Sequence, residues 1–394
     1  MRALAFDEIV TAAVGPRPGT VRPYPAQSVT GIAGFLRAQF DGAGARSVIV
    51  LGVDGVDFPT AAAWWRPDAL VPLVTTFPST SVVAWRSALV GAGPEVHGVP
   101  GVVYLDESCG RLFHAFRDRT LDRGDDWAGA EPADAVALPD VPTVFELLQR
   151  DGIECLAAAG DLVSWPGRWR DSTLRGARLC GQPRCWPAVR RDAALVVDAA
   201  TGDVERALAG RRGRRLVWSW LNLDDYLHAR GYDGELLASL PAVDAAARRW
   251  AAGGHLVVAH SDHGLVPSRA PTSLVAAWDR ANGPDLCRLP AGGAGRVRWS
   301  YPHPGRVGTV RRLLAAGLGT SALVAERSEL ADLGLVPPGD PLGEAVGPVV
   351  AIALGEDFPV PDPAARFEHG SITSPEMVVP LAVWAPPGLT IAGL

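Results

Sequence analysis

The chain has 394 residues, of which 48% are hydrophobic, enough for the core of one large α/β domain or of two ordinary ones. Its formal net charge is −6 and it contains no lysine, a balance that does not favour a polyanion-binding surface, so we expect no nucleic-acid polymer as a partner. No stretch approaches the length of a membrane span, the first residues lack the apolar segment of a secretory signal, and the five cysteines are scattered, so we expect a cytoplasmic protein with no membrane partner.

Strand-like apolar runs alternate with helix-like segments, the pattern of an α/β protein with a largely parallel central sheet and helices on both faces. The strands are predicted over 47–53, 153–158, 215–221 and 256–260, and the helices over 81–90, 141–150 and 234–250. Residues 266–345 are dominated by Pro, Gly and short amphipathic pieces, which predicts a small inserted subdomain or lid. The central sheet is predicted to resume at 349–354 and 378–384.

Several chemically active side chains follow these strands. Asp54 closes the strand at 47–53 and precedes Gly55; it is well placed as a metal ligand, although an Asp-Gly pair alone is also a common turn. Pro78 ends an extended run, and Ser81 stands at the start of the next helix, where an alkoxide or phosphate oxygen is stabilised. The same position suits an N-cap without chemistry, and it stays open which of Thr80 and Ser81 is the cap and which the nucleophile.

The later strands are followed by paired carboxylates and imidazoles. Asp224 and His228 are four residues apart, so on a helix they share a face and can bind one ion. Asp262 and His263 follow the strand at 256–260, and His369 lies in an Glu-His-Gly sequence near the C-terminus. Carboxylate and imidazole ligands around an alcohol are what two adjacent divalent cations require.

Other residues near these motifs have less specific interpretations. We interpret His97 as structural, and for His260 an indirect contact with the ligands is only the alternative interpretation. Trp64, Trp65 and Trp85 are predicted to be core residues, with stacking against a substrate ring as the alternative.

Taken in order, the motifs resemble the alkaline phosphatase superfamily, especially compact bacterial relatives of its type I phosphodiesterase/nucleotide pyrophosphatase branch. The resemblance covers residues 48–381. It rests on Asp54-Gly55, Pro78 to Ser81, Gly91 to Gly98, Asp224 to Gly231, Asp262 to Gly264, and His369-Gly370.

The resemblance implies an alkaline-phosphatase-like fold, one catalytic domain spanning residues 1–394, and two divalent metal ions. Zinc suits the mixed oxygen and nitrogen ligands best, with manganese or iron as alternatives. It implies that one ion is held beside Ser81 and the second close by; the two ligand sets are Asp54, Asp262 and His263, and Asp224, His228 and His369. Ser81 is then the nucleophile, and a small-molecule phosphodiester or nucleotide pyrophosphate is hydrolysed through a phosphoserine intermediate.

The chain departs from the branch at two positions. Ser81 stands where a threonine is usual, and Val102 stands where animal members have an asparagine that contacts phosphate. The ligands alone do not separate a phosphodiesterase from a phosphomonoesterase, a phosphonate hydrolase or a phosphomutase of the same superfamily. A catalytically silent binding protein is a further alternative, which a lost ligand would favour. The oligomeric state is not predicted.

Overall fold

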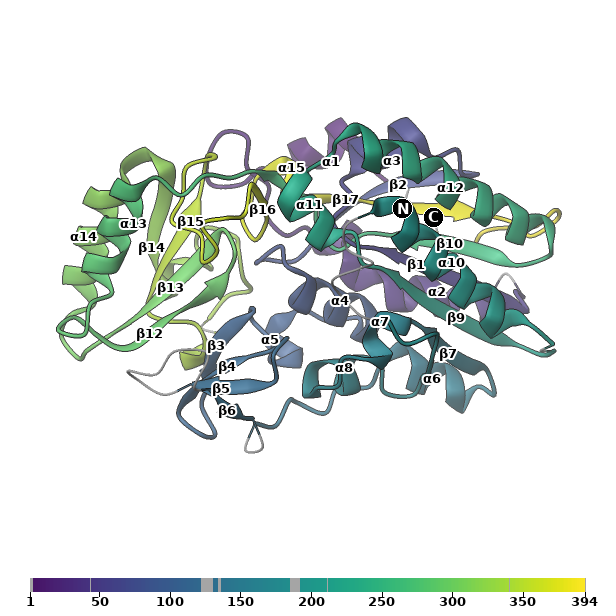
Figure 1. The fold of residues 1–394 in the computed structure, drawn as a ribbon, viewed down its shortest axis with the longest axis horizontal. Helices are drawn as coiled ribbons and strands as arrows, with labels where there is room; N and C mark the ends of the chain where they lie inside the picture. Colours follow the sequence, from purple (N-terminus) through teal and green to yellow (C-terminus); the bar gives the residue numbers. More distant parts are fainter. Residues whose placement is uncertain are drawn as a thin grey trace.

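Two β-sheets lie side by side along the long axis of the molecule (Figure 1). The computed structural model describes residues 3–42, 44–121, 130–133, 136–184, 192–210, 212–339 and 341–393. Both sheets contribute residues to the edge where the predicted site residues gather.

The larger sheet is the predicted central sheet, and most of its strands are parallel. Strands β10, β1, β9, β7 and β8 are neighbours in that order and pair in parallel, while β17 is antiparallel to both of its neighbours. The strand order across the sheet is β2 (Ala69–Val74), β17 (Val378–Trp384), β10 (Leu256–His260), β1 (Ser47–Val53), β9 (Arg215–Leu221), β7 (Glu154–Ala158) and β8 (Arg178–Cys180).

Helices cover both faces of this sheet, as predicted. All residues of β1 and β9 are buried, which is why both strands are continuous apolar runs in the sequence. One face packs against α3 (Phe58–Trp64), α10 (Ala193–Leu208) and α12 (Gly234–Ala252), and the other against α2 (Ile32–Asp41), α4 (Ser81–Val90) and α6 (Val144–Arg150) (Figure 1).

The smaller sheet is antiparallel and takes its strands from two distant parts of the chain. Its order is β14 (Ala322–Glu326), β15 (Val349–Ala353), β13 (Val297–Pro302), β12 (Cys287–Ala294), β3 (Val103–Asp106), β4 (Arg111–His114), β5 (Arg119–Leu121) and β6 (Glu131–Pro132). Helices α13 (Thr272–Ala281) and α14 (Val307–Leu318) pack on it (Figure 1).

The assignment of residues 349–354 to the central sheet was wrong. The strand exists, but β15 pairs with β13 and β14 in the smaller sheet. The error has a physical cause: a buried apolar run identifies a strand, but it carries no information about which sheet the strand joins. The smaller sheet also extends beyond residues 266–345, because β3 to β6 belong to it; a lid role for 266–345 stays a prediction.

Short elements complete the described structure. They are α1 (Phe6–Ala12), α5 (Pro94–His97), α7 (Gly160–Val163), α8 (Arg168–Thr173), α11 (Asp224–Arg230), α15 (Ser374–Met377), β11 (Val266–Pro267) and β16 (Phe367–Glu368). Among the helices of the described ranges, none is both long enough and apolar enough to cross a membrane.

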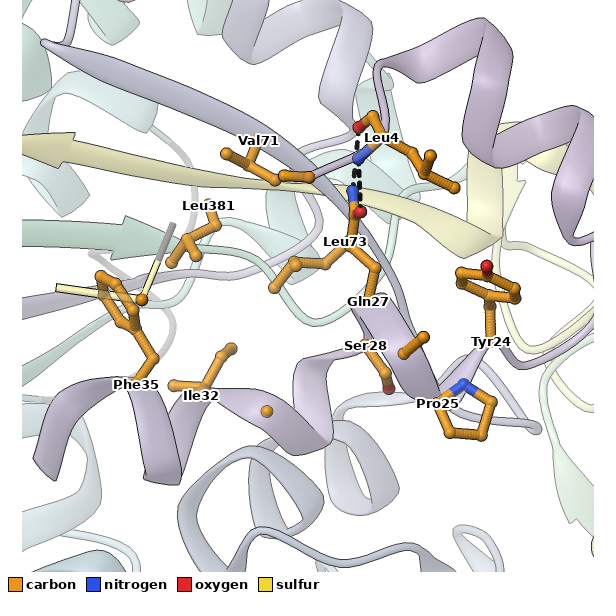
Figure 2. Close-up of a pocket in the computed structure, with 14 residues that line it drawn as sticks. Leu4, Tyr24, Pro25, Gln27, Ser28, Ile32, Phe35, Val71, Leu73 and Leu381 are labelled. Carbon is orange, nitrogen blue, oxygen red and sulfur yellow. Dashed lines mark hydrogen bonds between the residues drawn. The ribbon is translucent and has the colours of Figure 1, made fainter. Parts of the chain in front are cut away.

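A small apolar cavity of about 230 Å³ lies between α2 and strand β2 (Figure 2). Its walls include Ile32, Phe35 and Leu73, and the Gln27 side chain exchanges hydrogen bonds with the Leu4 backbone at 2.7 and 3.0 Å. Gln27 therefore fastens the N-terminal segment to β2. None of the residues that line this cavity is one of the predicted site residues.

Candidate active site

All seven predicted site residues meet at one edge of the central sheet. The edge is formed by the carboxyl ends of the parallel strands, where α/β proteins place their ligands. Asp54 follows β1, Asp224 and His228 lie on α11 after β9, and Asp262 and His263 follow β10. Ser81 begins α4 beyond β2, and His369 precedes the antiparallel β17, whose amino end lies at the same edge.

The first group of candidate ligands surrounds the Ser81 hydroxyl. Ser81 Oγ lies 3.0 Å from His263 Nε2 and 3.5 Å from Asp54 Oδ1. His263 Nε2 is 3.2 Å from Asp262 Oδ2, and ligand atoms of Asp54, Asp262 and His263 all lie within 4.8 Å of one another. At the start of α4, the Ser81 hydroxyl lies against these candidate ligands, whereas Thr80 occupies the N-cap position without a side-chain cap hydrogen bond.

The second group lies next to the first. His228 Nε2 is 3.2 Å from Asp224 Oδ2, and His369 Nε2 is 3.8 Å from the same oxygen. The imidazoles of His263 and His369 stack with their centroids 3.7 Å apart, which joins the two groups. Sequence reasoning missed Glu368: its carboxylate lies within 4.8 Å of nitrogens of both His228 and His369. In the sequence, its position next to His369 could have identified it as a candidate ligand.

Backbone carbonyls orient the imidazoles. His228 Nδ1 lies 2.8 Å from the Phe367 carbonyl oxygen, and His369 Nδ1 lies 2.9 Å from that of Ser79. Because a carbonyl oxygen only accepts, each Nδ1 donates its proton to it, and Nε2 is the ring nitrogen that faces the neighbouring carboxylates. Nε2 is therefore the atom of each ring that could bind a metal ion.

Two tryptophans hold the Asp54 carboxylate. The indole nitrogens of Trp220 and Trp85 donate to Asp54 Oδ2 at 2.7 and 3.1 Å, which leaves Oδ1 toward Ser81. Trp85 is thus a buried partner of a site residue and not a stacking platform. Trp65 packs against Trp384 in the core.

The remaining residues singled out from sequence lie farther from the ligands. His97 is fully buried and bonds to Ser87 Oγ at 2.9 Å, consistent with a structural role. Trp64 is the one tryptophan of the three with substantial exposure, at 38%. His260 packs on the Trp85 ring, with centroids 5.0 Å apart, and Trp85 in turn donates a hydrogen bond to Asp54.

The electrostatics of the cluster suit bound cations. Burial, with the nearby Asp262 and Asp224, raises the pKa of Asp54 well above its ordinary value, and burial also raises the pKa of Asp262. Burial would by itself raise the pKa of Asp224, but His228 and His369 outweigh it and hold that pKa below its ordinary value. Asp224 Oδ1 and Asp262 Oδ2 are buried without a hydrogen-bond partner among the described residues. Such carboxylates are costly unless a cation neutralises them, so the residues fit divalent metal ions.

A cavity of about 590 Å³ opens from the ligand cluster. Its aromatic wall is formed by Trp220, Trp165 and Phe116: the Trp165 and Trp220 rings are near parallel with centroids 6.5 Å apart, and Phe116 lies 4.9 Å from Trp165. His114, which could not be placed from sequence, and the exposed Arg117 also line the cavity. The resulting pocket is wide enough for a small molecule beside Ser81.

The smaller sheet supports the loop that carries His369. The Arg296 backbone N–H donates to the His369 carbonyl oxygen at 2.7 Å, and its buried guanidinium pairs with Glu376 at 3.0 Å. Gly370 has a φ of +115°, and a Cβ there would lie 1.9 Å from the Ala294 carbonyl oxygen, so only glycine fits this close approach. The smaller sheet is therefore part of the site's framework.

The comparisons with known proteins identify the fold. No protein-family model and no curated protein matches the sequence. Among solved structures, murine ectonucleotide pyrophosphatase/phosphodiesterase 5 matches with a TM-score of 0.62 and 16% identity, over 86% of this chain and 88% of that chain. Phosphonoacetate hydrolase from Sinorhizobium meliloti, in complex with phosphonoacetate, matches with a TM-score of 0.60 and 17% identity, over 88% and 92%.

A mutant of the alkaline phosphatase PafA matches with a TM-score of 0.56 and 12% identity, over 87% of this chain and 91% of that chain. The fold is thus alkaline-phosphatase-like, as the sequence resemblance implied. At these identities the likeness establishes the fold alone, and the chemistry has to be argued from the site.

Proposed function

We propose that this protein is an enzyme that hydrolyses phosphoric esters with two divalent metal ions and with Ser81 as the nucleophile. One observation carries the proposal: the Ser81 hydroxyl lies within 3.5 Å of both Asp54 and His263, at the start of a helix, inside a cluster of buried carboxylates and imidazoles. The alkaline-phosphatase-like fold supports it, because neighbours of this fold include a phosphodiesterase, a phosphonate hydrolase and a phosphatase.

The two groups of carboxylate and imidazole donors are the residues that would hold the ions. Asp54, Asp262 and His263 would hold one ion next to Ser81, and Asp224, His228 and His369 the other. Mixed carboxylate and imidazole donors favour zinc, with manganese or iron as alternatives. When bound, such ions lower the pKa of a nearby hydroxyl and polarise a phosphoryl oxygen.

With Ser81 as the nucleophile, the proposed reaction consists of two successive displacements at phosphorus. Ser81 Oγ attacks phosphorus, the bond to the leaving-group oxygen breaks, and the phosphoryl group becomes attached to Ser81. A water molecule then attacks the phosphoserine, which releases phosphate or a phosphate monoester and restores the hydroxyl. The amino end of α4 favours the negative charge on both the alkoxide and the phosphoryl oxygens.

The cavity favours a small-molecule phosphodiester or nucleotide pyrophosphate as the substrate. Phe116 and Trp165 offer aromatic surface to a planar leaving group, on which stacking contributes about 0.5–1.5 kcal/mol. The murine pyrophosphatase/phosphodiesterase has been solved, in an inactive form, in complex with AMP. We also propose a cytoplasmic location, which the odd number and scattered placement of the cysteines in the sequence support.

The test compares wild type, Ser81→Ala and Thr80→Ala, all loaded with zinc, on a chromogenic phosphodiester, the matching monoester and a phosphonate. We expect wild type to prefer the diester and Ser81→Ala to lose at least about 10³-fold in kcat, as enzymes do without their nucleophile. Thr80→Ala is the neighbouring control, and mass spectrometry of acid-quenched wild type should find phosphate on Ser81.

Each other outcome has a defined meaning. If Thr80→Ala lost turnover and Ser81→Ala retained it, the nucleophile would be Thr80 and not Ser81. Faster monoester or phosphonate turnover would make the protein a phosphomonoesterase or a phosphonate hydrolase. Full metal loading without turnover of any of the three substrates would favour a phosphomutase or a silent binding protein and would refute the hydrolase.

A further inference from the structure

A buried amide lies beside the ligand cluster without a hydrogen bond. Asn222 is 5% exposed and lines the cavity next to the candidate metal ligands. Within the part of the chain that the structure describes, its side chain has no hydrogen-bond partner. A side-chain amide carries two N–H donors and a carbonyl acceptor, and those of Asn222 face the cavity. The cavity is where a partner for this amide can enter.

The strand register places Asn222 alongside Asp54. Val53 of β1 is the partner of Leu221 of β9, and the Asp54 N–H donates to the Leu221 carbonyl oxygen at 3.0 Å. Asp54 and Asn222 are therefore the first residues after two neighbouring strands, and neighbouring strands are spaced by about 4.8 Å. Strand β9 ends at Leu221, and the Leu223 N–H donates to the Leu221 carbonyl oxygen at 2.9 Å, so the chain turns at Asn222. After this turn Asn222 lines the same cavity as Asp54 and Ser81.

Other potential donors of the cavity wall are the His114 imidazole and Thr80, whose buried hydroxyl has no hydrogen-bond partner among the described residues. The Trp220 N–H is bonded to Asp54, and the Nε2 atoms of His228 and His369 face carboxylates. Arg117 is exposed in the β4–β5 turn, and Val102, on another part of the cavity wall, has no donor. The carboxylates of the cluster repel an anion. A neutral amide donor is suited to such a place, since it binds a phosphoryl oxygen without forming an ion pair with the metal-binding carboxylates.

We propose that the Asn222 amide donates a hydrogen bond to a non-bridging oxygen of the substrate's phosphoryl group. The inference rests on the proposed function and adds to it a residue that binds the transferred group. Asn222 and Ser81 line the same cavity, so a phosphoryl group bound there beside Ser81 is open to this donor. The bond serves both the ester and the phosphoserine, because the same phosphoryl group is present in each.

The test measures binding of inorganic phosphate to zinc-loaded protein by calorimetry, with metal content and melting temperature determined on the same samples. We expect Asn222→Ala to raise the phosphate Kd and the KM for the ester by about 10- to 100-fold, the usual loss for a hydrogen bond to a charged group. Asn282→Ala is the matched control: it removes the chain's other asparagine, which caps α13 far from the cavity, and should leave phosphate affinity unchanged.

The Asn222→Asp variant separates an anion contact from a merely structural role. Aspartate has the shape of asparagine, so a structural role predicts that Asp is milder than Ala. An anion contact predicts the reverse order, because the carboxylate repels phosphate. Wild-type phosphate affinity in both variants at full zinc content would overturn the proposal, and so would loss of zinc in Asn222→Ala, which would make Asn222 a metal ligand. If wild type binds phosphate through Asn222 but hydrolyses no ester, the proposed function fails and the anion contact stands.

Discussion

The two indole hydrogen bonds to Asp54 predict how strongly its surroundings tune metal binding. Trp220→Phe removes the N–H that lies 2.7 Å from Asp54 Oδ2 and keeps most of the aromatic volume. A hydrogen bond to a charged group contributes about 1.5–3 kcal/mol, and each 1.4 kcal/mol is a factor of ten in an equilibrium constant. The zinc Kd of the site beside Ser81 should therefore rise by about 10- to 100-fold.

The same strand supplies a matched control for this substitution. Trp218 is 2% exposed and Trp220 is 3% exposed, but the Trp218 indole N–H has no hydrogen-bond partner among the described residues. Trp218→Phe thus carries the same loss of volume without the loss of a hydrogen bond. Competition with a chromophoric chelator would measure zinc affinity in both variants, and urea unfolding of the metal-free proteins would measure the cost of packing. Equal loss of zinc affinity in both would refute the reasoning, because Trp220 would then act through packing alone.

Two further predictions concern stability. Removing metal with a chelator should lower the melting temperature, because Asp54, Asp224 and Asp262 are then buried together without a cation. Added zinc should restore it. A melting temperature that responds to neither treatment would contradict a metal-binding cluster. His97 should make the protein acid-sensitive: burial lowers its pKa from the ordinary 6.5 to about 3 in the folded state, so the unfolded chain takes up the proton first as the pH falls below 6.5. Folding free energy is then lost at up to about 1.4 kcal/mol per pH unit between those values. Urea unfolding at pH 7 and pH 5 should show a smaller loss for His97→Gln, whose amide can still donate to Ser87; parallel losses would exclude His97 as a source of the effect.

Most strands of the central sheet, and the position of the candidate ligands at the strand ends, could be predicted from the sequence. Strands β9, β10 and β17 have the predicted bounds, because a strand buried on both faces is a continuous apolar run. Asp54, Asp224 and Asp262 each come shortly after such a run, so their position at the strand ends could be predicted from the adjacent sequence alone.

Pairings between distant segments could not be predicted in the same way. The joining of β3 to β12 depends on contacts between residues that local patterns do not relate, for example Val103 with Gly293. The hydrogen bonds of Trp85 and Trp220 to Asp54 form only where three separate elements meet. From the local sequence alone, a tryptophan in an apolar run is predicted to be a core residue. Glu368 and Asn222 lay next to recognised ligands, but only the fold turns them toward the site.

The position of β17 bears on how the molecule folds during synthesis. This strand lies between β2 and β10, with Val378 opposite Val74 and Leu381 opposite His260, so most of the chain separates it from one of its partners. Until residues 378–384 have left the ribosome, β2 and β10 each keep an open edge that can pair with another chain. The loop carrying His369 immediately precedes this strand, so the candidate metal-binding cluster is completed at the same late stage. A nascent chain should therefore gain the proposed active site only when this strand closes the sheet.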